Sequence, residues 1–312
     1  MTTLRSSAPR ILATLGALGA AAAVWGIGIE RHLYTVRRET LPVLPVGSAP
    51  LRILHISDIH MAPWQRRKQR WVASLAALEP DLVVNTGDNL GHPAGLAGVR
   101  AALDGLRGVP GVYVHGSNDL FAPQPRNPLR YFLGPSSRLP AVTRIDTAAM
   151  DRYLTDELGW TSLNDAAARV DVGGRSVDAF GVNDAHHGLD RLDRVPELTA
   201  ALRAGPGAPE ATIGVTHAPY RRVLDSFTGA GADALFAGHT HGGQVRVPGV
   251  GALVANCDLP LRQTRGLSEW QAAGRRVPLH VSAGLGHSIY APVRFACRPE
   301  TTLLTLVARP AD

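Results

Sequence analysis

The stretch LRILHISDIH, residues 51–60, begins as a short apolar run and ends in two polar side chains, Asp58 and His60. A short apolar run bounded by polar residues predicts a buried strand. Similar runs recur along the chain, separated by segments with a helical pattern. The predicted strands cover 51–57, 81–87 and 111–116, and the helices lie near 66–79 and 94–107. This βαβαβ order favours a largely parallel sheet that is covered on its faces.

The rest of the chain continues this organisation with more strands than helices. A proline-rich connection is expected at 120–140 and a helix at 147–158. Residues 168–182 read as a hairpin that turns at Gly173–Gly174. Further strands are expected at 211–217, 234–239, 244–254, 278–286 and 301–307. The sequence therefore predicts one α/β domain over 51–312, with no internal repeat.

The N-terminal region predicts a membrane segment. Residues 11–29 contain no charge and would span roughly 28 Å as a helix, close to the thickness of a bilayer core. We interpret 1–10 as a tail, 11–29 as a single-pass transmembrane anchor or a signal sequence, and 30–50 as a linker or edge strand. A buried core helix is the third interpretation. Arginines flank the segment on both sides, so their distribution does not decide its orientation.

Composition narrows the classes of function. The formal charge of +6 comes mainly from scattered arginines, and Lys68 is the only lysine. The only basic cluster, QRRKQR at 65–70, fits a solvated helix face, so a nucleic-acid partner is not expected, although an anionic membrane surface is compatible. Cys257 and Cys297 are too few for a disulfide framework and are expected to be buried thiols, with a single bridge as the alternative. A zinc site made of clustered thiolates is excluded.

Groups that bind metals follow five of the predicted strands. They are Asp58 and His60, Asp88, Asn118 and Asp119, His217, and finally His239 and His241 in LFAGHTHGGQV (235–245). Open α/β sheets bind ligands at the carboxyl ends of their strands. Any one of these residues alone would be read as a turn or helix cap, but five consecutive strand ends indicate a common site.

The mixture of carboxylates and imidazoles suits divalent cations such as Mn, Fe or Zn. Six or seven ligands are too many for one ion with an open position, and they fit two ions that share a carboxylate. A water bridging two such ions would be deprotonated near neutral pH and would be positioned to attack phosphorus. This pattern predicts a phosphate-ester substrate.

The motifs DIH, GDN, GSND, THAP and GHTH, in this order over about 51–308, resemble those of the calcineurin-like metallophosphoesterases. The extended GHTHGGQ and the tail GLGHSIYAPVRFACRPE resemble the branch of that family with an N-terminal membrane anchor. The resemblance implies a four-layer α/β/β/α sandwich of two mixed β-sheets. It also implies hydrolysis of phosphomonoester, phosphodiester or pyrophosphate bonds. The predicted anchor favours a membrane-associated phospholipid or lipid-linked substrate, because tethering raises the local concentration of such substrates.

The resemblance further implies a role for each matching residue. Asp58, His60 and His241 would bind the first metal ion, and His217 and His239 the second, with Asp88 bridging them. GSND departs from the family pattern G-N-H-(D/E), because Ser117 and Asn118 stand where the asparagine and histidine are expected. We expect Asn118 to replace the usual ligand, with Ser117 and a water as the alternative. The residues assigned to catalysis are Asp58, Asp88, Asn118 and His239.

The missing histidine leaves protonation of the leaving group open. His186, His187 and His287 lie beside glycines and are candidate replacement acids, although structural roles suit each of them. A sufficiently good leaving group would need no acid. Two other functions remain as alternatives. One is a metal-binding scaffold without activity, and the other is a nuclease of the same metal class, which would require a continuous basic groove.

Overall fold

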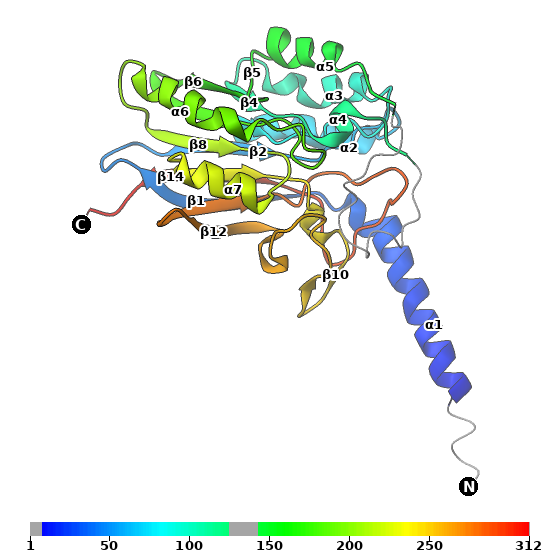
Figure 1. The fold of residues 1–312 in the computed structure, drawn as a ribbon. Coiled ribbons are helices and arrows are strands. Elements are labelled where there is room, and N and C mark those ends of the chain that lie inside the picture. The colour runs from blue at the N-terminus through cyan, green and yellow to red at the C-terminus, as the bar shows by residue number, and fades with distance from the viewer. Residues whose placement is uncertain (1–7, 125–142, 312) are drawn as a thin grey trace.

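The computed structural model describes residues 8–124 and 143–311. In these ranges the chain forms two six-stranded sheets, a small hairpin and helices outside the sheets, with one helix projecting from the body (Figure 1). Most of the predicted connection at 120–140 and of the predicted tail at 1–10 lies outside the described residues.

The first sheet contains the predicted βαβαβ unit. Its order is β1 (Thr35–Leu44), β14 (Glu300–Ala308), β2 (Leu51–Ile56), β3 (Leu82–Asn85), β4 (Gly111–Tyr113) and β5 (Thr161–Ser162). Strands β2 to β5 run parallel, whereas β14 is antiparallel to β2 and parallel to β1. The sheet is therefore mixed, and the predicted linker or edge-strand segment 30–50 supplies its edge strand β1.

The second sheet is also mixed. Its order is β12 (Gly266–Ala272), β13 (Arg275–Val281), β9 (Ala234–Ala237), β8 (Ala211–Val215), β7 (Arg175–Gly181) and β6 (Ala166–Val172). The four central strands run parallel, and each edge strand pairs antiparallel with its neighbour. The predicted hairpin about Gly173–Gly174 is the β6–β7 pair.

The two sheets pack face to face through aliphatic side chains. Val84 and Val112 of the first sheet share a buried cluster with Val177, Ile213 and Phe236 of the second. Burying each such side chain contributes about 1.5–3 kcal/mol. Strand residues on the opposite faces pack against the helices instead, because successive strand side chains alternate between faces.

Helices cover both outer faces. α2 (Arg66–Ala73), α3 (Leu96–Leu103) and α5 (Ala148–Arg152) pack on the first sheet. α6 (Val195–Ala204) and α7 (Arg221–Gly229) pack on the second, where Val223 and Phe227 meet strand residues such as Phe180 and Leu235. The arrangement confirms the predicted α/β/β/α sandwich of two mixed sheets (Figure 1). A further short helix, α4 (Ser117–Leu120), follows β4.

Some predicted elements differ from those in the structure. The single strand expected at 244–254 is a small hairpin of β10 (Arg246–Val247) and β11 (Gly251–Ala252), because Pro248 lacks an N–H and Gly249 has a φ of +79°. Strands β5 and β12 were not predicted. β5 has only two residues, and β12 is an edge strand whose apolar pattern is interrupted by polar side chains.

The projecting helix is α1 (Ala8–Val24), which continues through a π-helical turn (Trp25–Ile29) and a 3₁₀ turn (Glu30–His32). Within the continuous segment Pro9–His32, an 18-residue stretch has a mean hydropathy of 1.8, and 6% of that stretch is buried against the rest of the chain. Its length and composition are sufficient to cross a membrane. A signal sequence near the N-terminus would meet the same criteria.

Candidate metal centre

The predicted site residues lie just beyond the carboxyl ends of five strands. Asp58 follows β2, Asp88 follows β3, Asn118 lies in α4 after β4, His217 follows β8, and His239 follows β9. The two sheets meet at this edge. Here Nδ1 of His217, which follows β8 of the second sheet, donates to the carbonyl of Thr86, which follows β3 of the first sheet, at 2.7 Å. Residues far apart in the chain are therefore brought together where both sheets end.

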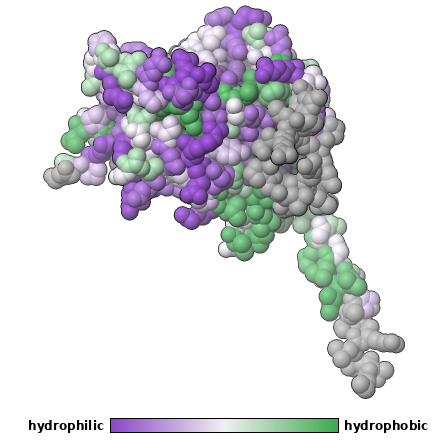
Figure 2. Space-filling model, in the orientation of Figure 1, coloured by the Kyte–Doolittle hydropathy of each residue, from purple (hydrophilic) through white to green (hydrophobic). Residues whose placement is uncertain are grey.

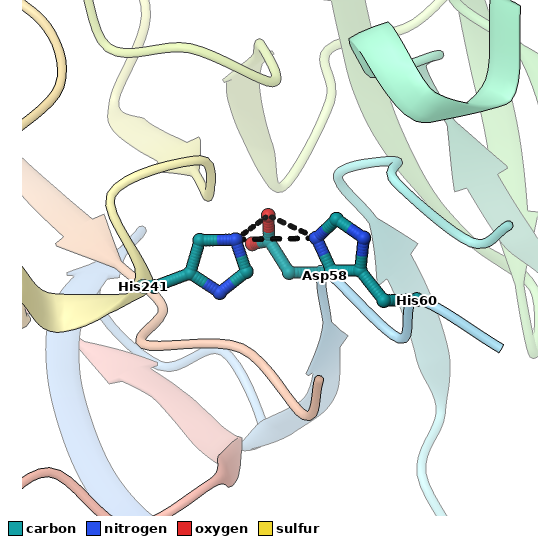
Figure 3. Close-up of side chains that lie close together, drawn as sticks. All are labelled: Asp58, His60 and His241. Atoms are coloured by element: carbon teal, nitrogen blue, oxygen red, sulfur yellow. Dashed lines mark hydrogen bonds and ion pairs between the residues drawn. The ribbon is translucent and has the colours of Figure 1, made fainter. Parts of the chain in front are cut away.

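One group consists of Asp58, His60 and His241, whose potential ligand atoms all lie within 4.8 Å of one another. Figure 3 shows the carboxylate of Asp58 between the two imidazole rings. Nε2 of His241 is 3.6 Å from Asp58 Oδ1, and Nε2 of His60 is 4.0 Å from the same oxygen. The two Nε2 atoms are 3.1 Å apart. This is a compact trio of nitrogen and oxygen donors.

A second group consists of Asp58, Asp88 and His217. Asp88 Oδ2 lies 3.6 Å from Nε2 of His217 and 3.4 Å from Nε2 of His60. The two groups therefore overlap, because Asp58 belongs to both and the Asp88 carboxylate lies between a histidine of each.

Asn118 and His239 extend the second group. The backbone N–H of Asn118 donates to Asp88 Oδ1 at 2.7 Å, and its side-chain amide lies 2.6 Å from Asp88 Oδ2. Nδ1 of His239 is 3.3 Å from Nε2 of His217. Ser117 points elsewhere, because its hydroxyl donates to Asp184 at 2.7 Å. Of the two alternatives within GSND, Asn118 is the residue whose side chain lies at the cluster.

Hydrogen bonds to backbone carbonyls orient the rings of His217 and His239. His217 donates from Nδ1 to Thr86, and His239 places Nε2 3.1 Å from the carbonyl of Asn256. In each neutral ring the remaining nitrogen then carries a lone pair, and these two nitrogens face each other. Metal-binding histidines commonly donate their second nitrogen in this way. Nε2 of His217 and Nδ1 of His239, each with a free lone pair, are therefore suited to bind one cation between them.

The charges also fit divalent cations. Burial raises the pKa of Asp58, and burial together with the nearby charge of Asp58 raises the pKa of Asp88 to about 7, although His217 opposes both shifts. Burial lowers the pKa of His60, His239 and His241. Against burial, the carboxylates of Asp88, Asp58 and Asp184 raise the pKa of His217 to about 9. Two buried carboxylates require a compensating positive charge, and bound cations would displace the proton of His217.

The glycines next to the site residues allow close approach. A Cβ atom on Gly238 would clash with Ser57 Oγ and lie 2.6 Å from Asp58 Oδ2. A Cβ atom on Gly116 would clash with the Asp88 carboxylate and lie 2.7 Å from Cε1 of His217. The strand ends can approach one another only because these positions have no side chain.

The backbone at the site is strained. Asp58, His60, Asp88, His239 and His241 all have φ between +44° and +68°. L-residues avoid this left-handed region at a cost of roughly 1–2 kcal/mol each. Such strain is characteristic of functional sites, where the surrounding structure holds the backbone in place.

The structure also adds Asp184, which the sequence pattern did not identify, and it gives the contacts of Asp119, which that pattern did identify. Asp184 accepts hydrogen bonds from Ser117 and from Nδ1 of His187, each at 2.7 Å. Asp119 accepts the backbone N–H groups of Asn89 and Gly116. The only signal for Asp184 is its place before the His186–His187 pair, and the signal for Asp119 is its position after a strand.

Two buried basic side chains, those of Lys68 and Arg294, lie next to the group formed by Asp58, His60 and His241. Lys68 donates to the carbonyls of Ile59 and His60 at 2.7 and 3.3 Å, and burial lowers its pKa to about 7. The guanidinium of Arg294 donates to the carbonyls of Ala283 and Gly286, and its Nη2 lies 3.3 Å from Nδ1 of His241. The predicted thiols, Cys257 and Cys297, are buried and unpaired.

Comparison with known proteins places the chain in a family. The family model for the calcineurin-like phosphoesterases matches residues 51–243. Phosphodiesterase YaeI of Escherichia coli is 43% identical over 75 residues, which cover 24% of this chain and 25% of YaeI. The chain thus aligns with about a quarter of YaeI. The uncharacterized metallophosphoesterase YkuE of Bacillus subtilis is 23% identical over 307 residues, covering 93% of this chain and 94% of YkuE.

Among solved structures, the NAD nucleotidase of Haemophilus influenzae has a TM-score of 0.45 and 12% identity, covering 76% of this chain and 51% of that one. The family match includes the segments with Asp58, Asp88, His217 and His241, so the predicted resemblance is confirmed. The chain belongs to the calcineurin-like phosphoesterase family, and its fold and Asp/His cluster are those of a metal-dependent phosphoester hydrolase.

Proposed function

We propose that the protein hydrolyses phosphomonoester, phosphodiester or pyrophosphate bonds with two divalent cations, Mn, Fe or Zn, at the centre described above. The observation that carries the proposal is the overlap of the two donor groups, which share Asp58 and approach each other at Asp88. A pair of cations that share a ligand fits this arrangement better than two separate sites.

Each residue has a role in this proposal. Asp58, His60 and His241 hold the first cation, and Asn118, His217 and His239 hold the second, with Asp88 between them. When bound, such a pair lowers the pKa of a water molecule and neutralises the charge that develops on phosphoryl oxygens. The chain fixes the ligand atoms through the bonds from His217 to Thr86 and from His239 to Asn256.

The leaving-group side of the centre is proposed to lie near Asn118, where the family has its histidine. Asp184 connects this region to His187, because it accepts hydrogen bonds from both Ser117 and His187. The ring of His186 lies 4.5 Å from that of His239, between centroids. His287 lies near His60 instead, and burial lowers its pKa to about 3, with Lys68 and Arg294 adding to this shift. This arrangement favours His187 over His287 as the replacement acid.

We further propose that α1 is a retained anchor and that the substrate is associated with the membrane. The supporting observation is the low burial of a helix that has the length and hydropathy of a membrane span. A tether raises the local concentration of substrates held in the same bilayer. The centre would then act on a phospholipid or a lipid-linked phosphoester.

The test uses the full chain in nanodiscs. Elemental analysis should find about two divalent cations per chain, and hydrolysis of bis(p-nitrophenyl) phosphate or p-nitrophenyl phosphate should depend on them. Asp88→Asn should abolish turnover, whereas Asp193→Asn at an exposed surface position should not. Two bound cations with no turnover on any phosphoester would instead identify a metal-binding scaffold. Failure to bind cations would refute the proposed centre.

A further inference from the structure

The hairpin of β10 and β11 exposes a group of apolar side chains. Val250 at its turn is 77% exposed, and Val247 and Leu253 are 40% and 44% exposed. Single exposed apolar residues are common on soluble proteins, but these three lie within seven residues of chain around Pro248. Figure 2 shows an apolar patch on this part of the body, beside α1, whereas much of the remaining visible surface is hydrophilic.

The hairpin is joined to the base of α1 through one short segment, residues 294–297. Val245 forms a bridge with Phe295, and the N–H of Arg246 donates to the Phe295 carbonyl at 2.9 Å. The next two N–H groups, of Ala296 and Cys297, donate to the carboxylate of Glu30 at 2.9 and 2.6 Å. The hairpin and the end of the helix are therefore held by adjacent residues of the same segment.

The end of the helix packs closely against this segment. The N–H of Arg294 donates to the carbonyl of Gly26 at 3.1 Å, and a Cβ atom on Gly26 would lie 2.9 Å from the Arg294 carbonyl. Trp25 donates to Glu30 at 2.7 Å while its side chain remains partly exposed. A half-exposed tryptophan at the end of an apolar helix is typical of the membrane–water interface. These contacts fix the position of the hairpin relative to the proposed anchor.

We infer that the hairpin tip, defined as Val247 to Val250, inserts into the surface of the same lipid bilayer that α1 crosses. The bilayer is the occupant that the structure favours, because the patch lies beside an exposed apolar helix and is fixed to its base. Interfacial elements of this kind bury their apolar face roughly 5–10 Å into the boundary between headgroups and acyl chains. This inference rests on the proposed anchor.

Insertion of the tip would set the position of the metal centre. The hairpin begins five residues after His241, and it ends four residues before Asn256, whose carbonyl is 3.1 Å from Nε2 of His239. Ala252 of β11 lies against Gly243, where a Cβ atom would approach within 2.5 Å. The centre is therefore held close to the membrane surface. The substrate class is a lipid phosphoester whose acyl chains remain in the bilayer while its headgroup reaches the cations.

The experiment measures depth in the bilayer with spin labels on the full chain in nanodiscs of phosphatidylcholine and phosphatidylglycerol. The label is placed at Val250→Cys, and collision rates with oxygen and with a water-soluble nickel chelate are compared. The native Cys257 and Cys297 are buried, and the unsubstituted chain measures any background from them. The expected result is that the Val250 label lies below the lipid phosphates. A second label at Val247→Cys should give a similar depth.

The matched control is Val46→Cys, which is 67% exposed and follows the end of β1 that is farther from α1. This label should report an aqueous environment, whereas Leu15→Cys in α1 should report the acyl region. Equal accessibility of the Val250 and Val46 labels would overturn the inference. A Leu15 label in water would remove the anchor and the inference with it.

The measurement requires neither bound cations nor turnover. The Asp88→Asn variant, which should be inactive, is expected to give the same depth at Val250. The failure of the proposed activity and the failure of membrane docking are therefore distinguishable. Val250→Asp with labels at Val247→Cys and at Leu15→Cys tests the chemistry of the tip, since a charge should move the Val247 label toward water while the Leu15 label stays in the acyl region.

Discussion

Asn118 holds both oxygens of Asp88, with its backbone N–H 2.7 Å from Oδ1 and its side-chain amide 2.6 Å from Oδ2. Ser117, one residue earlier, is turned away and bonds to Asp184. An amide carries its acceptor and its donor on the same carbon, so in the proposed centre the side chain of Asn118 would supply a neutral oxygen ligand.

The first prediction concerns this pair of residues. Asn118→Ala should reduce the cation content from two to one per chain and lower turnover by about 100-fold or more, since even residues that only orient ligands contribute 10–100-fold. Ser117→Ala should keep both cations. Elemental analysis and turnover on an aryl phosphodiester measure these outcomes. Loss of a cation from the serine variant alone would assign the ligand to Ser117.

The second prediction follows from the raised pKa of Asp88. The pKa is about 7 in the fold and 3.8 ordinarily, so the folded state keeps a proton that the unfolded state releases as the pH rises above about 4. This group therefore destabilises the metal-free fold increasingly up to pH 7. Metal-free Asp88→Asn should be more stable than metal-free wild type above pH 7, and the difference should disappear near pH 4.

With Mn²⁺ bound, the wild type should instead be more stable than Asp88→Asn, because the ionised carboxylate of Asp88 then contributes to cation binding. Urea unfolding with and without a chelator, at several pH values, measures the free energy of unfolding of both variants in the metal-bound and metal-free states. The same order in the presence and absence of Mn²⁺ would be inconsistent with Asp88 as a ligand.

The third prediction concerns close approach at Gly238. Gly238→Ala should displace the Asp58 carboxylate, because the added methyl would lie 2.6 Å from Oδ2. We expect loss of cation binding and a destabilisation of about 1–3 kcal/mol, as for other overpacked positions. Gly229→Ala at the end of α7 is the control, since its nearest neighbour would be 3.7 Å away. Equal cation affinity in both variants would argue against this explanation.

The fourth prediction concerns protonation of the leaving group. His187 is held by Asp184, whose pKa is kept well below its usual range by His187, His217 and Ser117 even though burial opposes this. His187→Ala should slow esters of poor leaving groups by roughly 100-fold, the lower range for general acids, and hardly affect p-nitrophenyl esters. His186→Ala and His287→Ala should affect both kinds equally. Identical dependence on the leaving group in all three variants would mean that none of these histidines is the acid.

The clustering of the proposed metal-binding residues could be predicted from the sequence because these residues follow parallel strands. Asp58, Asp88 and His217 each come directly after a short apolar run, and parallel strands bring their carboxyl ends to one edge of a sheet. The strand pattern does not report which loop side chains turn toward that edge. Asp184 and Arg294 lie in irregular segments, so their positions depend on the packing of the two sheets.

The errors in the fold have similar causes. Residues 244–254 have an apolar pattern that suits a strand, but Pro248 and Gly249 break it into a hairpin. β12 pairs only along one side, so its outward positions include Glu269 and Gln271 and the strand shows no apolar run. Periodicity identifies elements that are buried on at least one face, and it detects exposed edges poorly.

The left-handed conformation of five side-chain-bearing residues at the centre has a consequence for evolution in the laboratory. Glycine would relieve the local backbone strain at each of these positions, so the intact centre makes the fold less stable than a chain with glycine there. A library of variants selected for heat resistance alone should accumulate glycine at Asp58, His60, Asp88, His239 and His241. Selection that also demands turnover should retain the original residues there and place its compensating substitutions elsewhere in the sandwich.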